Sequence, residues 1–183
     1  MKKSLEEVWG QHAEEVALRG YATLKTLEKA TDPIILWLKE ISENTKEKLK
    51  LLDAGSGVGQ YVKNAELLDF DPQGIDISEK AVKIARENGL DVVLGDIRKM
   101  PFKDSYFDLV VAGGSLEHFP ETEKAISEVS RVLKSGGFLL GNVPYRYTFF
   151  VITKKIQQLL GVWKCGYEKS FSIKKWRKIL KKY

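Results

Sequence analysis

The middle of the chain alternates between short apolar runs and helical segments, and this alternation restricts the fold more than any other feature. The apolar runs lie at 49–54, 74–77, 92–95, 107–112 and 138–143. Amphipathic spacing typical of helices is found at 58–68, 78–88 and 121–133. Short strands separated by crossover helices are typical of a parallel sheet. The sequence therefore predicts an α/β fold: a Rossmann-like, doubly wound, mostly parallel sheet with helices on both faces.

Further helices are expected before this sheet, within residues 1–45. Ser4 and Glu7 have the spacing of a capping box, and Asp32 followed by Pro33 is typical of a helix N-cap and first turn. No linker or repeat divides the chain, so residues 1–183 are interpreted as one domain. Within it, residues 48–144 are expected to form the core that contains the sheet, and residues 145–183 a basic helical part.

The composition disfavours several classes of protein. No stretch approaches the ~20 consecutive apolar residues of a membrane span. The amino end turns acidic where a signal peptide needs an apolar run, which favours a cytoplasmic location. The single cysteine, Cys165, cannot form an intrachain disulfide, and with His12 and His118 it does not make a zinc-ligand spacing. We therefore expect no metal site.

Charge is distributed unevenly along the chain. Residues 145–183 contain eleven lysines and arginines but one acid, Glu168, a net charge of +10, whereas the preceding residues carry −5. Such a basic end can form solvated helix faces, or it can bind an anion, a nucleic acid or a membrane surface. Because no motif that reads RNA or DNA accompanies the charge, a nucleic-acid partner is disfavoured.

The predicted strands end in residues suited to a nucleoside ligand. A glycine-rich turn, Asp53–Gly59 (DAGSGVG), follows the first strand and leads into a helix, where backbone N–H groups can approach a ligand closely. Asp76 ends the second strand, where a carboxylate can accept both hydroxyls of a ribose. Asp96 ends the third strand, where it can accept an exocyclic amine beside the backbone of Ile97. A purely structural tight turn is the alternative interpretation of the glycines.

Five segments together resemble a known family. They are LLDAGSGVGQ, GIDIS, GDIRKMPF, FDLVVAGGSLEHF and LKSGGFLLGNVP, in that order between Leu51 and Pro144. Their order and spacing resemble the class I S-adenosylmethionine-dependent methyltransferases of the small-molecule type, over roughly half of the chain. The resemblance implies an enzyme that moves the methyl group of S-adenosylmethionine to an O, N or C nucleophile and releases S-adenosylhomocysteine.

The same resemblance assigns residues to parts of the cofactor. Asp76 would hold the ribose, Asp96 with Ile97 the adenine, and Ser115 would border the sulfonium. The residues assigned to the methionine moiety are Asp53, Gly55, Gly57 and Gly59, and Ser56 and Ile77 complete the cofactor-binding set.

Two neighbouring residues are candidates for acid–base chemistry. His118 has an ordinary pKa near neutrality and can act as a general base on the acceptor, and Glu117 competes for this role. The alternative is a histidine that only packs or orients its neighbours. Methyl transfer can also proceed by alignment of the two reactants without any base.

The basic, aromatic segment from Tyr145 to Ser170 follows the fifth strand, where family members carry a substrate-covering insertion. Its apolar side chains at 149, 150, 152, 156, 159 and 160 are most simply explained by a core-facing helix. A lid over the substrate is a second interpretation. A helix on a membrane surface is a third, supported by Lys154, Lys155, Trp163 and Lys164. The methyl acceptor is accordingly a small molecule, apolar or anionic.

One departure from the family concerns the end of the sheet. Family members continue into two further strands, whereas this chain stops at Tyr183, so we expect the final antiparallel hairpin to be missing. The fifth strand would then be an exposed edge, through which the chain can self-associate. Three rival functions follow: a catalytically silent methyltransferase-like binding subunit, an NAD-type oxidoreductase, and an RNA methyltransferase. The NAD-type oxidoreductase is disfavoured because the glycine-rich turn at Asp53–Gly59 lacks the G-x-G-x-x-G spacing of dinucleotide-binding proteins.

Overall fold

The computed structural model of the chain describes Trp9, Ala13, Leu27, residues 30–163 and residues 166–183. The expected capping box of Ser4 and Glu7 lies outside the described residues, as do His12, Lys164 and Cys165.

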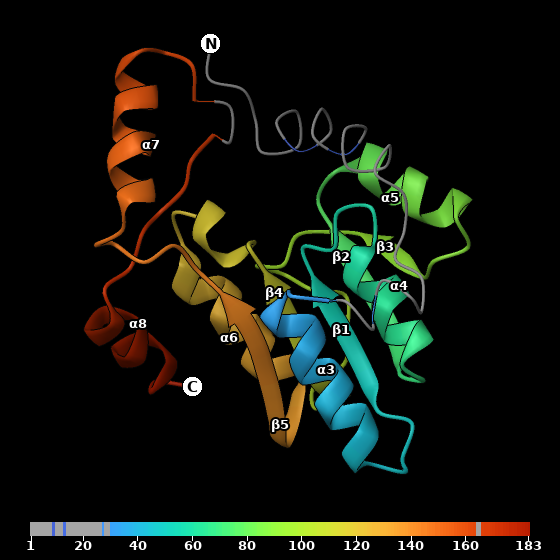
Figure 1. Cartoon of the computed structure of the whole chain (residues 1–183). Coiled ribbons are helices and arrows are strands. Elements are labelled where there is room, and N and C mark those ends of the chain that lie inside the picture. The colour runs from blue at the N-terminus through green and yellow to red at the C-terminus, as the bar shows by residue number, and fades with distance from the viewer. Residues whose placement is uncertain (1–8, 10–12, 14–26, 28–29, 164–165) are drawn as a thin grey trace.

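A sheet of five parallel strands forms the centre of the molecule (Figure 1). The strands are β1 (Lys50–Ala54), β2 (Asp71–Asp76), β3 (Val92–Leu94), β4 (Phe107–Gly113) and β5 (Leu133–Asn142). Their order is β3-β2-β1-β4-β5, and every pairing is parallel. The order reverses direction between β1 and β4, and in open α/β sheets this is the point where ligands bind. The predicted fold class is therefore confirmed.

Helices cover both faces of this sheet. On one face lie α3 (Pro33–Asn44), α4 (Gln60–Leu67) and α5 (Glu79–Glu87), whose buried side chains pack on Leu51, Leu109 and Val92. On the other face lie α6 (Thr122–Val132) and α8 (Ile173–Leu180), which share a core with Leu52 and Val110. Successive strand residues point to opposite faces, so each strand supplies both cores.

Two strands differ in extent from their predictions. β2 begins at Asp71 rather than Gly74, because the polar start of the strand hides its pairing with β1 from an analysis of apolar runs. β5 begins at Leu133, so the expected turn at 135–137 is an irregularity within the strand, where the register with β4 shifts and Gly136 has a φ of +80°. In the part of the chain that the structure describes, no antiparallel strand pairs with β5.

The prediction of a core-facing helix after β5 is wrong. The helix forms, but its apolar side faces away from the core. Helix α7 (Phe149–Leu159) stands outside the layers of the sheet and its covering helices (Figure 1). Its apolar residues are exposed, and its one buried residue is Lys154. Helix α8, in contrast, packs on the sheet, with Ser172 as its N-cap and Ile179 buried in the core. None of the described helices is both long and apolar enough to cross a membrane.

The N-cap of α3 joins this helix to the start of α4. The Asp32 carboxylate accepts the Ile34 amide N–H over 2.8 Å, as predicted, and its other oxygen accepts the Tyr61 hydroxyl over 2.8 Å. One side chain thus caps one helix and anchors the aromatic ring of another.

We expect Asp32→Ala to lower the free energy of unfolding by about 1–2 kcal/mol, because it removes a helix cap, and by more once the loss of the Tyr61 bond is added. Urea denaturation measures the change. Tyr61→Phe, which removes only the second bond, and Asp32→Ser, which keeps a capping oxygen, are the controls. Equal stability of Asp32→Ala and the parent would contradict this account of the cap.

Candidate cofactor and acceptor site

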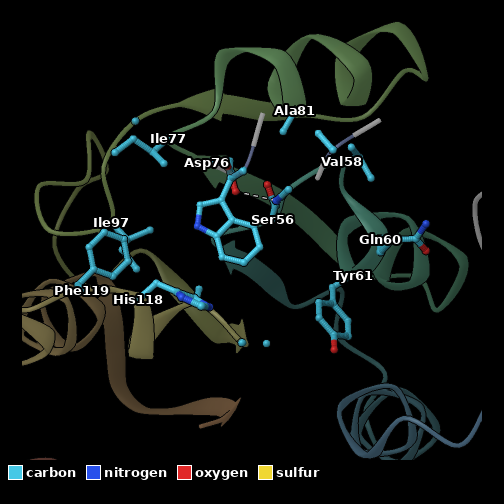
Figure 2. A pocket seen from close by; sticks show the side chains of 18 residues that line it. Ser56, Val58, Gln60, Tyr61, Asp76, Ile77, Ala81, Ile97, His118 and Phe119 are labelled. Atoms are coloured by element: carbon cyan, nitrogen blue, oxygen red, sulfur yellow. Dashed lines mark hydrogen bonds between the residues drawn. The ribbon is translucent and has the colours of Figure 1, made fainter. Parts of the chain in front are cut away.

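A pocket of about 330 Å³ lies at the carboxyl ends of the strands (Figure 2). Its walls come from the turn between β1 and α4, the end of β2, the loop after β3 and the 3₁₀ turn after β4 (Leu116–His118). The predicted site residues that line it are Gly55, Ser56, Gly57, Asp76, Ile77, Ile97, Ser115 and His118. Four predicted residues, Asp53, Gly59, Asp96 and Glu117, are not in the lining.

The glycine turn presents bare backbone to this pocket at Gly57. Its φ is +54°, in the left-handed region that favours glycine, and a Cβ atom built there would meet no protein atom within 4 Å. Any side chain at this position would therefore extend into the open space of the pocket. Gly59 differs, since a Cβ there would lie 2.6 Å from Leu90 Cδ1. Its part in the turn is close packing, not contact with a ligand.

Asp76 fixes the position of the turn from the neighbouring strand. One carboxylate oxygen accepts the Gly57 amide N–H over 2.8 Å, and the other accepts the Ser78 amide N–H over 2.8 Å. The side chain is nearly buried and lines the pocket. Burial raises the pKa of Asp76, although the N–H groups of Ser78 and Gly57 act in the opposite direction. A carboxylate with remaining acceptor capacity therefore faces the cavity.

Asp53 is a buried acid behind the turn. Only 1% of it is exposed, and neither carboxylate oxygen has a hydrogen-bond partner among the described residues. Burial raises its pKa to about 8, and the nearby charge of Asp76 adds to the shift. Asp53 is not in the pocket lining, whereas its neighbours Gly55, Ser56 and Gly57 are.

In the loop after β3, the side chain of Asp96 pairs with an arginine, and the side chain of Ile97 lines the pocket. Arg98 engages the Asp96 carboxylate, with Nη2 2.6 Å from Oδ2 and Nε 3.0 Å from each oxygen. The Arg98 amide N–H also donates to this carboxylate, and Arg98 lowers the pKa of Asp96, against the effect of its partial burial. Asp96 is therefore occupied in holding the loop, while Ile97 lines the pocket. The same arginine reaches Glu121 over 2.7 Å, which ties the loop to the start of α6.

His118 lies in the wall of the pocket with a defined proton position. Its Nδ1 is 2.8 Å from the carbonyl oxygen of Tyr167. Since a carbonyl oxygen can only accept, we infer that Nδ1 carries the proton of the neutral ring and that Nε2 is the free base. Burial lowers the pKa of His118, so the neutral form predominates near pH 7. The ring also packs edge-on against Trp9, with centroids 4.6 Å apart.

Glu117 lies behind His118 in a small group of buried charges. Its Oε1 is 4.0 Å from His118 Nε2, and its Oε2 is buried without a hydrogen-bond partner among the described residues. Burial raises the pKa of Glu117 to about 7; Glu168 raises it further and Lys154 lowers it. The backbone carbonyl of Glu117 accepts the Lys169 amide N–H over 2.9 Å. Residues 167–169 therefore run against this turn and hold both of its polar residues.

Several pocket residues were missed by the sequence analysis. Trp9 and Ala13 come from the amino-terminal region, which was interpreted as packing helix only, and Phe119 follows the 3₁₀ turn. Tyr61 is the second residue of α4, and its ring packs on bare backbone at Gly113. The position of Tyr61 just after the glycine turn was the one available signal. The described residues contain no group of three His, Cys, Asp or Glu side chains that could hold a metal ion.

Comparison with known proteins places this geometry in context. Residues 52–141 match the family model of the methyltransferase domain. A relative is the rice (Oryza sativa subsp. japonica) protein 2-methyl-6-phytyl-1,4-hydroquinone methyltransferase 1, chloroplastic, which is 34% identical over 112 residues. That alignment covers 56% of this chain and 33% of the rice protein, so the chain spans about a third of this relative's length.

The fold is also similar to solved structures of methyltransferases. A methyltransferase from Bacillus halodurans C-125 is 28% identical with a TM-score of 0.65, over 80% of this chain and 66% of that one. An S-adenosylmethionine-dependent methyltransferase from Thermotoga maritima aligns over 96% of this chain and 79% of its own, with a TM-score of 0.69. At 21% identity the second match concerns the fold alone.

The raised pKa of Asp53 makes stability depend on pH. An acid whose pKa is higher in the folded state stabilises the protein in its protonated form, so the free energy of unfolding falls as the pH rises from about 4 to 8. Each group contributes a slope of up to about 1.4 kcal/mol per pH unit. We expect Asp53→Asn to flatten this slope, most clearly between pH 7 and 8, above the pKa of Glu117.

Urea denaturation at a series of pH values measures the slope. Asp69→Asn is the matched control, because Asp69 is an exposed carboxylate with a positive φ that asparagine also adopts. An Asp53→Asn slope identical to that of the parent would show that Asp53 is ionised in the folded protein.

Proposed function

We propose that the chain is a class I methyltransferase that binds S-adenosylmethionine in this pocket and methylates a small molecule, since residues 52–141 match the family model of the methyltransferase domain. The observation that carries the proposal is the convergence of Gly57, Asp76 and Ile97 on one cavity at the switch point of the sheet. A nucleoside with an amino-acid tail needs close backbone approach, an acceptor for a diol and an apolar surface for a base. Gly57 allows the close backbone approach, Asp76 is the acceptor for the diol, and Ile97 is the apolar surface.

The residues of the pocket fit this cofactor. When bound, S-adenosylmethionine supplies a methyl group on a sulfonium, an electrophile that carries its own leaving group. We assign the ribose hydroxyls to Asp76 and the adenine to the apolar surface of Ile77, Ile97 and Phe119. The methionine tail is assigned to the bare backbone at Gly57. We propose that Asp96 contributes to adenine binding indirectly, because its ion pair with Arg98 fixes the loop that carries Ile97.

The acceptor side of the pocket is proposed to be the wall around Ser115 and His118. The Ser115 hydroxyl donates to the Ala54 carbonyl over 2.6 Å, which holds the end of β4 against the end of β1. The neutral His118 ring, with Nδ1 bound to the Tyr167 carbonyl, keeps Nε2 available to take a proton from an acceptor hydroxyl or amine. Glu117 is a positioning residue in this proposal, because it approaches His118 without lining the pocket.

We propose an apolar acceptor, such as a phenol or hydroquinone. Trp9 lines the cavity and packs against His118, with ring centroids 4.6 Å apart, so it gives the acceptor side an apolar wall. The rice relative acts by its name on a hydroquinone, which agrees with this chemistry. A cytoplasmic location and self-association through the β5 edge stay predictions of the sequence.

The first test separates cofactor classes. We expect Gly57→Val to weaken binding of S-adenosylhomocysteine at least tenfold by calorimetry, since the new side chain would extend into the cavity. Gly89→Val is the matched control, because Gly89 also has a positive φ, +77°, and open space around its Cβ position, but lies at the end of α5. Binding of NAD instead of S-adenosylhomocysteine by the parent, or equal affinity of the two variants, would refute the assignment.

The second test concerns the proton. We expect His118→Ala to reduce methyl transfer from S-adenosylmethionine to a substituted hydroquinone roughly 100-fold or more. Affinity for S-adenosylhomocysteine should change little. Glu117→Gln should change the pH dependence of the rate more than the rate at its optimum, since it removes a titrating neighbour. Equal rates for His118→Ala and the parent would remove the base from the mechanism, whereas cofactor binding without transfer to any acceptor would favour the silent binding subunit.

A further inference from the structure

Helix α7 turns its apolar side chains outward. Leu159 is 88% exposed and Phe149 is 78% exposed, values that are extreme for large apolar residues. The exposed apolar residues recur at helical spacing and lie along one side of the helix. We call them the α7 stripe: Phe149, Ile152, Ile156, Leu159 and Leu160.

A buried ion pair holds the opposite side of the helix. Lys154 Nζ is 2.8 Å from Glu168 Oε1 and 2.6 Å from the Glu168 carbonyl oxygen, and the two side chains are only 6% and 7% exposed. Removing either partner would leave a buried charge uncompensated, so this pair fixes which side of α7 faces the protein. The outward position of the stripe is therefore built into the fold.

The same ion pair removes negative charge from the surface. Glu168 is the one acidic residue between positions 145 and 183, and its carboxylate is buried against Lys154. In the described part of this segment, the exposed charged side chains are therefore all cationic. They include Lys155 on α7 and Arg146 three residues before it. The lysines of α8 lie instead beside Glu123 of α6, which pairs with Lys182 over 2.6 Å.

Exposed tyrosines lie in the segments before and after α7. Tyr147 is 72% exposed, and Tyr145 and Tyr167 are also exposed. Phe150 and Trp163 pack edge-on with centroids 6.1 Å apart on the inward side of the helix, where Lys154 Nζ is 5.5 Å from the Trp163 ring centroid. Tyrosine and tryptophan favour the boundary between lipid headgroups and acyl chains, because their rings are apolar and their polar atoms stay near water.

We propose that the α7 stripe and the cationic side chains around it dock on the surface of an anionic phospholipid bilayer. Eleven residues make a helix of about 16 Å, and a span needs about 20 residues, so α7 would lie flat with the stripe among the acyl chains. Its basic neighbours would contact the acidic headgroups. The proposal goes beyond methyl transfer and does not depend on it.

Charge distinguishes this occupant from two others. A second copy docked through the same face would set a cationic surface against itself, which costs free energy. A nucleic acid would satisfy the lysines and arginines but leave the apolar stripe in water. An anionic bilayer matches both the charge and the apolar side chains.

Sedimentation with vesicles tests the proposal on the whole chain. We expect binding to vesicles of phosphatidylcholine with 30% phosphatidylserine, and at least tenfold weaker binding to phosphatidylcholine alone. Leu159→Glu should reduce binding to the mixed vesicles at least tenfold, and Lys155→Gln about fivefold. Leu36→Glu is the matched control, because Leu36 is an exposed leucine on α3, away from α7, and it should bind as the parent does.

Each other outcome overturns the proposal. These outcomes are absence of binding to the mixed vesicles, equal binding to both vesicle types, and binding that survives Leu159→Glu. A dimer in sedimentation velocity that Leu159→Glu dissociates would assign the stripe to a second copy. Urea denaturation of Leu159→Glu with the same midpoint as the parent shows that the variant is folded. Because this control does not use the cofactor, failure of this proposal stays distinguishable from failure of the proposed function.

Discussion

The pocket depends on one buried carboxylate. Asp76 ends β2 and accepts one N–H from the glycine turn and one from the start of α5, each over 2.8 Å. It therefore connects the ends of two neighbouring strands and the helices that follow them. The two N–H groups stabilise the charged carboxylate and so oppose the rise in the pKa of Asp76 that burial causes, without cancelling it. The alignment of the glycine turn with the end of β2 follows from these two bonds.

Local chemistry decided which parts of the fold could be predicted. The strands and helices between 49 and 142 were predicted because apolar periodicity and caps such as Ser78 act within a few residues. The turn at Gly57 and the carboxylate of Asp76 were predicted because each follows directly after a strand. The start of β2 was not, because its polar residues pair through backbone groups alone, and such pairing leaves no side-chain pattern.

Side-chain pairing, both local and long-range, decided what could not be predicted. Asp96 has the right position for a ligand contact, but Arg98 engages it, and nothing in the spacing distinguishes an occupied carboxylate from a free one. The orientation of α7 is a second case, since its apolar spacing also fits a core-facing helix. Lys154 and Glu168, fourteen residues apart, reverse it. Trp9 is a third, because it reaches His118 across more than a hundred residues.

The packing of Tyr61 on Gly113 restricts how related chains can vary. A Cβ atom at position 113 would lie 2.3 Å from the Tyr61 ring, so no residue other than glycine fits while the ring is there. The ring in turn is held by its hydroxyl bond to Asp32. Positions 32, 61 and 113 belong to three separate elements but are coupled through the Tyr61 side chain. A side chain at 113 therefore requires that the ring at 61 moves away or is replaced by a smaller residue, which would also break the hydroxyl bond to Asp32.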